Sequence, residues 1–531
     1  MANLSMLPKR LDAALIFQVV GILTALKLLQ IAYRIYLHPL RKIPGPTLAK
    51  TSELWRTSRY FAGNWHEDIR QLHRQYGGVV RIAPNEVSVA DPDLPNTVYG
   101  ITQGTGKTKA YNTWQAFGGY RWIIALFPNF SMFPEQDKEV HRALRARVSN
   151  IYTIQSFVTM EEKATPVYQD VLRSLDKLAQ SGAEIDFAAW ANLFTYDIVT
   201  CFSIGKDMGY VRAGSDYNGF IESVHLAVYY IANLTNVWGR SNWYQNPIVK
   251  YWSRWFGSGK VADATNCLAK LSVVQAIEAR KQQGPNPKGK QDMLDALFEM
   301  KSITGKPVSP FEILVELGNP LIAGGDTTAV AIAAILGPLM LDRQRYQRLQ
   351  AEIDSAIKVV RSERGPSELL SFDDVKGLPY LKACITEGMR MHPSITFQLP
   401  RKAPKNGIAL GGHFIPGGTV ISMSTAAQNR LKTIFGEDAD EWRPERWLDS
   451  DIDTLKRMEK GLSTFGYGTR ACLGKNLAIL SIYKLISNLV ARYELQLTGP
   501  RDQPWSSRAM WFTKIEGMMV KFQRRQIEKE C

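Results

Sequence analysis

A glycine-rich loop surrounds Cys472, with the sequence FGYGTRACLG from Phe465 to Gly474. The glycines let the backbone bend sharply and approach a flat ligand closely. The apolar-periodic stretch 476–489 predicts a long helix directly after the loop, whose first N–H groups can point at the sulfur and favour the thiolate. Such a thiolate can bind a haem iron and promote cleavage of the O–O bond. The alternative is a small buried cysteine in a tight turn, the usual setting of a lone cysteine.

A second segment whose residues could take part in catalysis is AGGDTT, which starts at Ala323. Two successive glycines cost about 1 kcal/mol each in a helix interior, relative to alanine. We expect Ala323 and Gly324 to contact a flat cofactor there, and Thr327 to hydrogen-bond back to the Ala323 carbonyl. The alternative is a plain helix-packing notch, with Thr327 as an ordinary core hydroxyl.

Long helices must position both segments. Ser309 as N-cap, Pro310 at the first helical position and Glu312 in a capping box predict a helix that runs to about Leu341. Within it, Pro320 removes a backbone hydrogen bond and can bend the helix. Glycine, proline and β-branched residues gather only at 79–90 and 395–425. The predicted fold class is therefore mainly α with small β-sheets.

Residues 13–33 are apolar enough, and long enough, to cross about 30 Å of hydrocarbon. A cleaved secretory signal would need a short apolar region and a small-residue cleavage site, whereas this run continues into Tyr33 and Arg34. We expect a lumenal N-terminus at 1–12, a transmembrane anchor at 13–33, a basic and proline-rich hinge at 34–46 and a catalytic domain at 47–531. The positive charge after the span favours a cytosolic catalytic domain.

The composition excludes several other classes. The net charge is +15, but the basic residues are dispersed and no nucleic-acid motif is present. The stretch Gly104 to Thr108 resembles the end of a phosphate-binding loop, but Ile101 stands where the first glycine belongs. The five cysteines form no CxxC pair, which indicates a reducing compartment. We expect three of them to be core residues, namely Cys201, Cys267 and Cys384.

The loop around Cys472 resembles the haem-binding signature of the cytochrome P-450 family, and the other segments follow in the family's order over essentially the whole chain. The resemblance implies the P-450 fold, preceded by one transmembrane helix. It implies haem as cofactor and Cys472 as the metal ligand, with Phe465, Gly468, Arg470 and Gly474 lining the cofactor. It also implies that Asp326 and Thr327 form the acid-alcohol pair that relays protons to the reacting dioxygen.

The same resemblance implies a structural ion triad made of Glu387, Arg390 and Arg446. Glu387 and Arg390 are spaced i, i+3 on a predicted helix, and Arg446 follows in the RPERW segment. The haem propionates need basic partners, preferably arginine. The candidates are Arg470, Arg401, His141 and Arg145, although the family usually has tryptophan where His141 stands. Any one of these could instead be a solvated surface residue.

The implied function is insertion of one oxygen atom from dioxygen into a hydrophobic small molecule, with electrons from an NADPH-cytochrome reductase or a cytochrome b-type donor. The rivals are a redox-neutral isomerase or dehydratase, and a non-catalytic haem carrier or sensor. The segments HPLRKIPGP and HRALRARVSN are similar to fungal enzymes of secondary metabolism, including the pisatin-demethylase-like group. The implied location is the endoplasmic reticulum membrane. By position in the family, the substrate pocket is lined by Trp114, Phe117, Leu321, Phe397, Trp511 and Phe512.

Overall fold

The computed structural model describes residues 13–100, 104–116, 131–234, 273–284, 289, 291–365, 369–502 and 504–526. In the first half of the chain the helices are α1 (Ala13–Ala32), the π-turn η1 (Tyr33–Leu37), α2 (Thr47–Thr51), α3 (Leu54–Ala62), α4 (Trp65–Tyr76), α5 (Leu94–Thr97), η2 (Lys109–Ala116), α7 (Lys138–Ser149), α8 (Ile154–Ser181), α9 (Phe187–Ile204), α10 (Tyr210–Ala213) and α11 (Phe220–Leu234). The later helices are α14 (Val273–Gln283), α15 (Met293–Phe298), α16 (Pro310–Leu341), α17 (Arg343–Arg364), α18 (Phe372–Val375), α19 (Pro379–Met391), α20 (Thr425–Gln428), α21 (Lys432–Phe435), α22 (Arg446–Asp449), α23 (Ile452–Gly461), η4 (Gly468–Arg470) and α24 (Lys475–Arg492).

The strands are short and form four small sheets. The largest sheet has the order β1 (Val79–Ala83), β2 (Glu86–Val89), β8 (Val420–Met423), β5 (Arg401–Lys402) and β3 (Gly106–Lys107). The others are β4 (Glu184–Asp186) with β12 (Met519–Arg524) and β9 (Tyr493–Leu497), the hairpin β6 (Ile408–Leu410) and β7 (His413–Ile415), and the hairpin β10 (Ser506–Met510) and β11 (Phe512–Glu516). The fold is mainly α with small sheets, which confirms the predicted class. The strands after residue 490 were not predicted.

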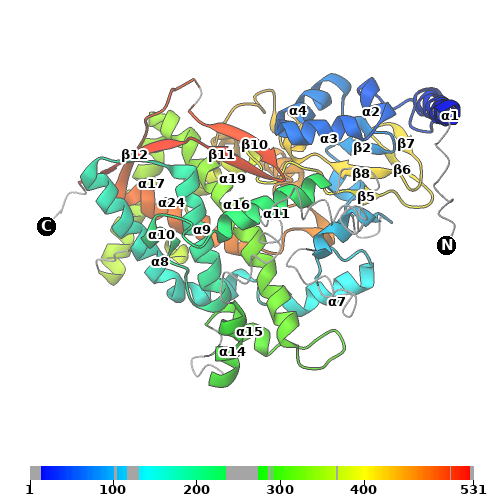
Figure 1. The fold of residues 1–531 in the computed structure, drawn as a ribbon. Helices are drawn as coiled ribbons and strands as arrows, with labels where there is room; N and C mark the ends of the chain where they lie inside the picture. Colours follow the sequence, from blue (N-terminus) through cyan, green and yellow to red (C-terminus); the bar gives the residue numbers. More distant parts are fainter. Residues whose placement is uncertain are drawn as a thin grey trace.

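Helix α16 crosses the middle of the molecule, with α9 packed along it (Figure 1). The Ser309 hydroxyl accepts a hydrogen bond from the Glu312 N–H, and the Glu312 carboxylate accepts one from the Ser309 N–H, so the predicted capping box is present. The helix ends at Leu341 as predicted. Helices α16 and α9 are both apolar, but 78% of the apolar stretch of α16 and 83% of that of α9 are buried. The two helices therefore form part of the core of the protein.

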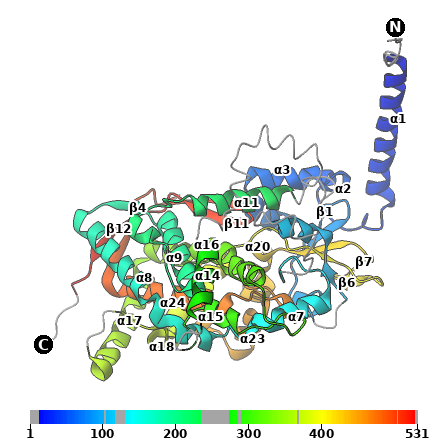
Figure 2. The same cartoon turned by 60° about the horizontal axis from the view of Figure 1, so that its bottom comes forward.

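Helix α1 stands apart from the body of the protein (Figure 2). The helical run continues through the π-turn to Leu37, beyond the predicted end at Tyr33, and its apolar stretch Phe17–Leu37 has no buried part. An exposed apolar helix of this length is compatible with a membrane anchor. The expected lumenal segment 1–12 lies outside the described residues.

The segment after α1 is held against strand β1. The Pro44 carbonyl accepts a hydrogen bond of 2.7 Å from the Arg81 N–H. At Gly45, a Cβ atom would lie 2.3 Å from the Arg81 carbonyl oxygen. The guanidinium of Arg81 donates to the Arg34 carbonyl at 3.1 Å. The chain between helix and domain is therefore packed on the sheet.

Candidate active site

The loop from Phe465 to Gly474 closes on itself through a hydrogen bond of 2.8 Å from the Cys472 N–H to the Phe465 carbonyl. Gly468 has a φ of +61°, and a Cβ atom there would lie 2.3 Å from the carbonyl oxygen of Tyr99. Glycine is therefore required at this position for close approach to another part of the chain. The helix predicted at 476–489 is present as α24, which starts three residues after Cys472.

Cys472 keeps an exposed surface at the start of α24. Desolvation by its neighbours raises the pKa of the thiol, while hydrogen bonds from the N–H groups of Gly474 and Lys475, and the charge of Arg145, act in the opposite direction. Amide groups thus point at the sulfur, as expected from the sequence. An accessible sulfur with donors on one side suits a cysteine whose thiol proton is replaced by a metal ion.

Five basic side chains gather beside this loop, and we call them the cation cluster: Lys107, His141, Arg145, Arg401 and Arg470. Burial, followed by repulsion from Arg470 and the other cations, lowers the pKa of His141 to about 3. Burial and the charges of Arg470 and Arg401 lower the pKa of Lys107 to about 6. The structure therefore brings together all four basic residues predicted from the sequence. It adds Lys107, which lies in the GTGKT stretch that had been set aside as a failed phosphate loop.

The members of the cation cluster differ in how their donors are used. Arg401 donates to the Tyr111 hydroxyl at 2.6 Å and also contacts the carbonyls of Leu399 and Pro400. Arg145 donates to the Ala471 carbonyl at 2.9 Å. Nη1 of Arg470 is buried and has no hydrogen-bond partner among the described residues.

Mutual repulsion and an unused guanidinium donor are the features of a site that an anionic ligand completes. Haem carries two carboxylates, and the accessible sulfur of Cys472 lies beside the cations, close enough for the charge of Arg145 to act on its thiol. The donor set therefore fits haem. When bound, haem would supply an iron centre that activates dioxygen.

On helix α16, the Thr327 hydroxyl donates a hydrogen bond of 2.7 Å to the Ala323 carbonyl, as predicted. The Thr327 carbonyl in turn accepts a hydrogen bond of 2.7 Å from the Ser394 hydroxyl. Ala323 is exposed, although it lies in the middle of a core helix. This part of α16 thus has an accessible face that carries a polar side chain.

The structure gives the paired glycines a packing role. A Cβ atom on Gly324 would lie 3.0 Å from Val199, and one on Gly325 would lie 2.5 Å from the ring of Tyr196. Both contacts are with α9, so the glycines let two core helices approach closely. The packing notch, raised as the alternative, describes them. Contact with α9 accounts for the missing side chains of both glycines. The expected contact of Ala323 and Gly324 with a flat cofactor stays a prediction.

Asp326 is buried and forms an ion pair with His225 on α11, with 2.7 Å between Oδ1 and Nε2. Sequence reasoning missed His225, because the two residues are 101 positions apart and no local pattern connects them. Asp326 and His225 line a hollow together with residues of α9 and β11. The acid predicted for proton relay thus faces a space next to the core helix.

The aromatic residues expected in the substrate pocket are partly brought together. Ring centroids lie 4.5 Å apart for Trp114 and Trp511, and 6.2 Å apart for Phe397 and Trp511. Trp511 has a φ of +81°, an uncommon backbone conformation for a bulky residue that is found at functional sites. Phe512 lines the hollow beside Asp326 instead. Leu321 is fully buried in the main core, so its placement in the pocket is not supported, and Phe117 lies outside the described residues.

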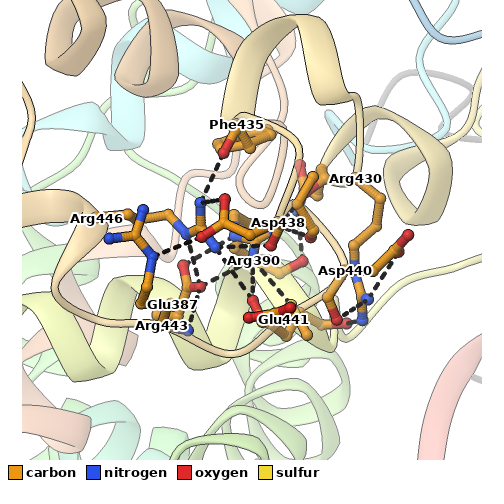
Figure 3. Close-up of polar contacts among 12 residues, drawn as sticks. Glu387, Arg390, Arg430, Phe435, Asp438, Asp440, Glu441, Arg443 and Arg446 are labelled. Atoms are coloured by element: carbon orange, nitrogen blue, oxygen red, sulfur yellow. Dashed lines mark hydrogen bonds and ion pairs between the residues drawn. The ribbon is translucent and has the colours of Figure 1, made fainter.

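The predicted triad is assembled from Glu387 and Arg390 of helix α19 and Arg446 at the start of α22 (Figure 3). Glu387 pairs with Arg390 at 2.8 Å and with Arg446 at 2.9 Å, and all three side chains have no exposed surface. Carbonyl groups of the loop 429–441 accept the remaining N–H groups of both arginines. Burial would raise the pKa of Glu387, but hydrogen bonds and charges from Arg390 and Arg446 outweigh it and hold the pKa below its ordinary value.

Comparison with known proteins agrees with this geometry. Residues 46–522 match the family model described as cytochrome P-450. A cytochrome P-450 monooxygenase of Aspergillus flavus is 30% identical over 495 residues, which cover 92% of this chain and 93% of that protein. The cytochrome P-450 monooxygenase pkfB of Emericella nidulans is 31% identical, with 91% of each chain covered. The monooxygenase mpaDE of Penicillium brevicompactum is 29% identical, and the match spans 91% of this chain but 55% of that longer protein. The chain therefore belongs to the cytochrome P-450 family of haem-dependent monooxygenases.

Proposed function

We propose that this protein is a membrane-anchored haem-thiolate monooxygenase, in which Cys472 is the axial ligand, the cation cluster holds the haem propionates, and Asp326 and Thr327 relay protons to dioxygen. The observation that carries the proposal is the setting of Cys472: an accessible sulfur that accepts hydrogen bonds from the Gly474 and Lys475 N–H groups, with buried cations beside it. A small structural cysteine needs neither feature. The buried Cys384, whose thiol pKa is raised by desolvation, shows that ordinary case in the same chain.

The substrate proposed for this site is a hydrophobic small molecule of fungal secondary metabolism. The aromatic rings of Trp114, Phe397 and Trp511 support an apolar ligand, and the relatives named above are fungal monooxygenases. As in the family, electrons come from a redox partner, for which we propose an NADPH-cytochrome reductase. A cytochrome b-type protein is the alternative donor.

The exposed helix α1 supports anchoring in the endoplasmic reticulum membrane, with the catalytic domain in the cytosol. In that arrangement the packed segment between α1 and strand β1 would keep the domain close to the bilayer. Deleting residues 1–38 is then expected to release much of the protein from membranes without changing its haem spectrum. Carbonate extraction of the full-length protein decides the point: release as a soluble species would overturn the membrane-spanning proposal.

The ligand assignment is tested with Cys472→Ser in the full-length protein. The variant is expected to lose the thiolate-type Soret band of the reduced carbon monoxide complex, because a hydroxyl group does not replace a soft thiolate on iron. Cys384→Ser is the matched control, since that cysteine is buried in the core of the protein. A thiolate-type band that survives in Cys472→Ser would refute the assignment.

The relay is tested separately with Thr327→Ala. The variant keeps the haem but loses the hydroxyl that bonds to Ala323, so protons should arrive less selectively and more of the consumed NADPH should appear as hydrogen peroxide. General acid assistance typically contributes about a hundredfold to ten-thousandfold in rate, although water can replace part of it. NADPH and peroxide are measured together. A redox-neutral enzyme or a haem carrier would show no sustained NADPH use in either form of the protein.

A further inference from the structure

The ion pair between His225 and Asp326 connects a buried carboxylate to an open space. The two side chains have exposed fractions of 24% and 6%. The hollow that they line also has polar groups from Asn192 on α9 and Lys514 on β11, among apolar residues such as Val228 and Phe512. A hollow with several polar groups can hold water. Water there can reach the imidazole more readily than the carboxylate, which is the less exposed of the two groups.

Asp326 directly precedes Thr327, whose hydroxyl lies near the exposed Ala323. The carboxylate thus stands between the hollow and the accessible face of α16. His225 is its ion-pair partner among the described residues, at 2.7 Å. A proton that enters from the hollow and reaches Asp326 by side chains would pass through the imidazole.

We propose that His225 carries protons from the hollow to Asp326 and so supplies the acid-alcohol relay. This inference rests on the proposed function, because it takes Asp326 as a member of that relay. In each transfer, the imidazolium N–H on Nε2 gives its proton to Oδ1 of Asp326, leaving a neutral imidazole and a carboxylic acid. Water in the hollow then returns a proton to the ring. After Asp326 has passed its proton on, both groups are back in their starting charge states.

The charges around His225 favour the protonated form of its ring. Burial alone would lower its pKa, but the charge and hydrogen bond of Asp326 on α16 outweigh burial, so that the pKa is raised. Lys514 on β11 opposes this effect, and Asp216, before α11, reinforces it. An imidazole ring can both take up and release a proton, which suits a proton carrier.

A merely structural ion pair between α11 and α16 is the competing explanation. The two roles separate in His225→Gln, because the glutamine amide can still donate a hydrogen bond to Asp326 but cannot pass a proton on. A structural role predicts near-normal turnover in this variant. A proton-carrying role predicts slow turnover that small added bases can restore. Val228→Ala, which alters the same hollow without changing its charge, is the control.

The experiment uses the full-length haem-loaded enzyme with an NADPH-cytochrome reductase, in light and heavy water, without any organic substrate. NADPH oxidation and peroxide formation are followed over a range of pH. His225→Gln should slow NADPH oxidation about tenfold, less than the hundredfold or more that a direct general acid contributes, because water can still reach Asp326 slowly. The solvent isotope effect should rise, the pH dependence should flatten, and added imidazole should restore part of the rate. Val228→Ala should keep the original pH profile.

A second measurement does not depend on turnover. Diethylpyrocarbonate modifies neutral imidazole, so the extent of His225 modification against pH, read by mass spectrometry of its peptide, reports the pKa of the ring. Asp326→Asn should move the midpoint to lower pH, since the carboxylate raises this pKa. An unmoved midpoint, or a His225→Gln enzyme with normal rate, pH profile and isotope effect, overturns the role of His225. If Asp326→Asn itself turns over normally, the relay in the proposed function fails instead.

Discussion

The triad and the cation cluster are two groups of charged side chains in this protein, and they differ in how their charges are balanced. In the triad, Glu387 faces Arg390 and Arg446, Asp438 adds a second carboxylate, and nearby carbonyl groups accept the remaining arginine N–H groups. In the cation cluster, basic side chains converge, and burial together with the neighbouring positive charges lowers the pKa of Lys107, His141 and Arg470. The triad is complete within the polypeptide, whereas we propose that the cation cluster is completed by the haem propionates.

The contrast separates side chains whose charges stabilise the fold from side chains that we propose bind the cofactor. A buried charge that loses its partner destabilises the fold strongly. A buried cation among other cations already lacks a partner, so its removal should cost the haem-free fold little and cost ligand binding more. Three substitutions test this difference.

The largest effect is expected for Glu387→Gln. The substitution keeps the shape of the side chain but leaves Arg390 buried without a counter-charge and Arg446 with Asp438 alone, which should cost about 3 to 5 kcal/mol in the free energy of unfolding. The variant should therefore accumulate with little haem rather than show a purely kinetic defect. Urea denaturation and the haem content per polypeptide measure both effects.

The control for this prediction is Glu139→Gln. Glu139 also pairs with an arginine, Arg142, at 2.9 Å, but both side chains are more than 70% exposed. Exposed pairs contribute about 1 kcal/mol or less. Equal losses in the two variants would mean that the triad is no more than an ordinary ion pair.

A smaller and different effect is expected for Arg470→Gln. Because Nη1 of Arg470 has no partner among the described residues, the haem-free fold should keep its stability or gain slightly from reduced repulsion. Haem release should become faster, since a hydrogen bond to a charged group contributes about 1.5 to 3 kcal/mol, or about tenfold or more in affinity. Transfer of haem to an acceptor globin gives the release rate. Arg142→Gln, an exposed residue on the helix that carries His141 and Arg145, is the control.

The opposite pattern would contradict this comparison. If Arg470→Gln lowered the stability of the haem-free protein while haem release stayed unchanged, the cation cluster would be a structural network like the triad. Its lowered pKa values would then reflect burial alone.

The sequence predicted the features that depend on interactions between residues close together in the chain. The capping box at Ser309, the helix after Cys472 and the i, i+3 pair of Glu387 and Arg390 each depend on residues a few positions apart. The hydrogen bond from Thr327 to Ala323 is local in the same sense and was also predicted.

Contacts between distant segments could not be read in this way. Gly324 and Gly325 of α16 face α9, which lies more than a hundred residues earlier in the chain. His225 reaches Asp326 only because α11 lies against the same hollow. Lys107 joins the cation cluster through the pairing of β3 with β5, which brings it opposite Arg401. Its own neighbours suggested a phosphate loop, so the local pattern pointed away from its actual surroundings.

The smallest expected effect is the pH dependence of the stability of the haem-free protein, which depends mainly on Lys107. In the haem-free protein its pKa is lowered to about 6 from an ordinary value of 10.5, so between these values the unfolded chain binds more protons than the folded one. Stability should therefore rise with pH across the neutral to mildly alkaline range, by at most about 1.4 kcal/mol per pH unit. His141 acts in the same direction but only between about pH 3 and pH 6.5. Glu387, whose pKa is held below 4.5, contributes nothing to the pH dependence above that value.

Lys107→Met should flatten the rise in the thermal midpoint of the haem-free protein. Bound carboxylates should raise the pKa of Lys107 again, so the haem-loaded enzyme should show a weaker rise than the haem-free protein. An equal rise in both forms, or one that survives in Lys107→Met, would show that the cations are not what the ligand neutralises.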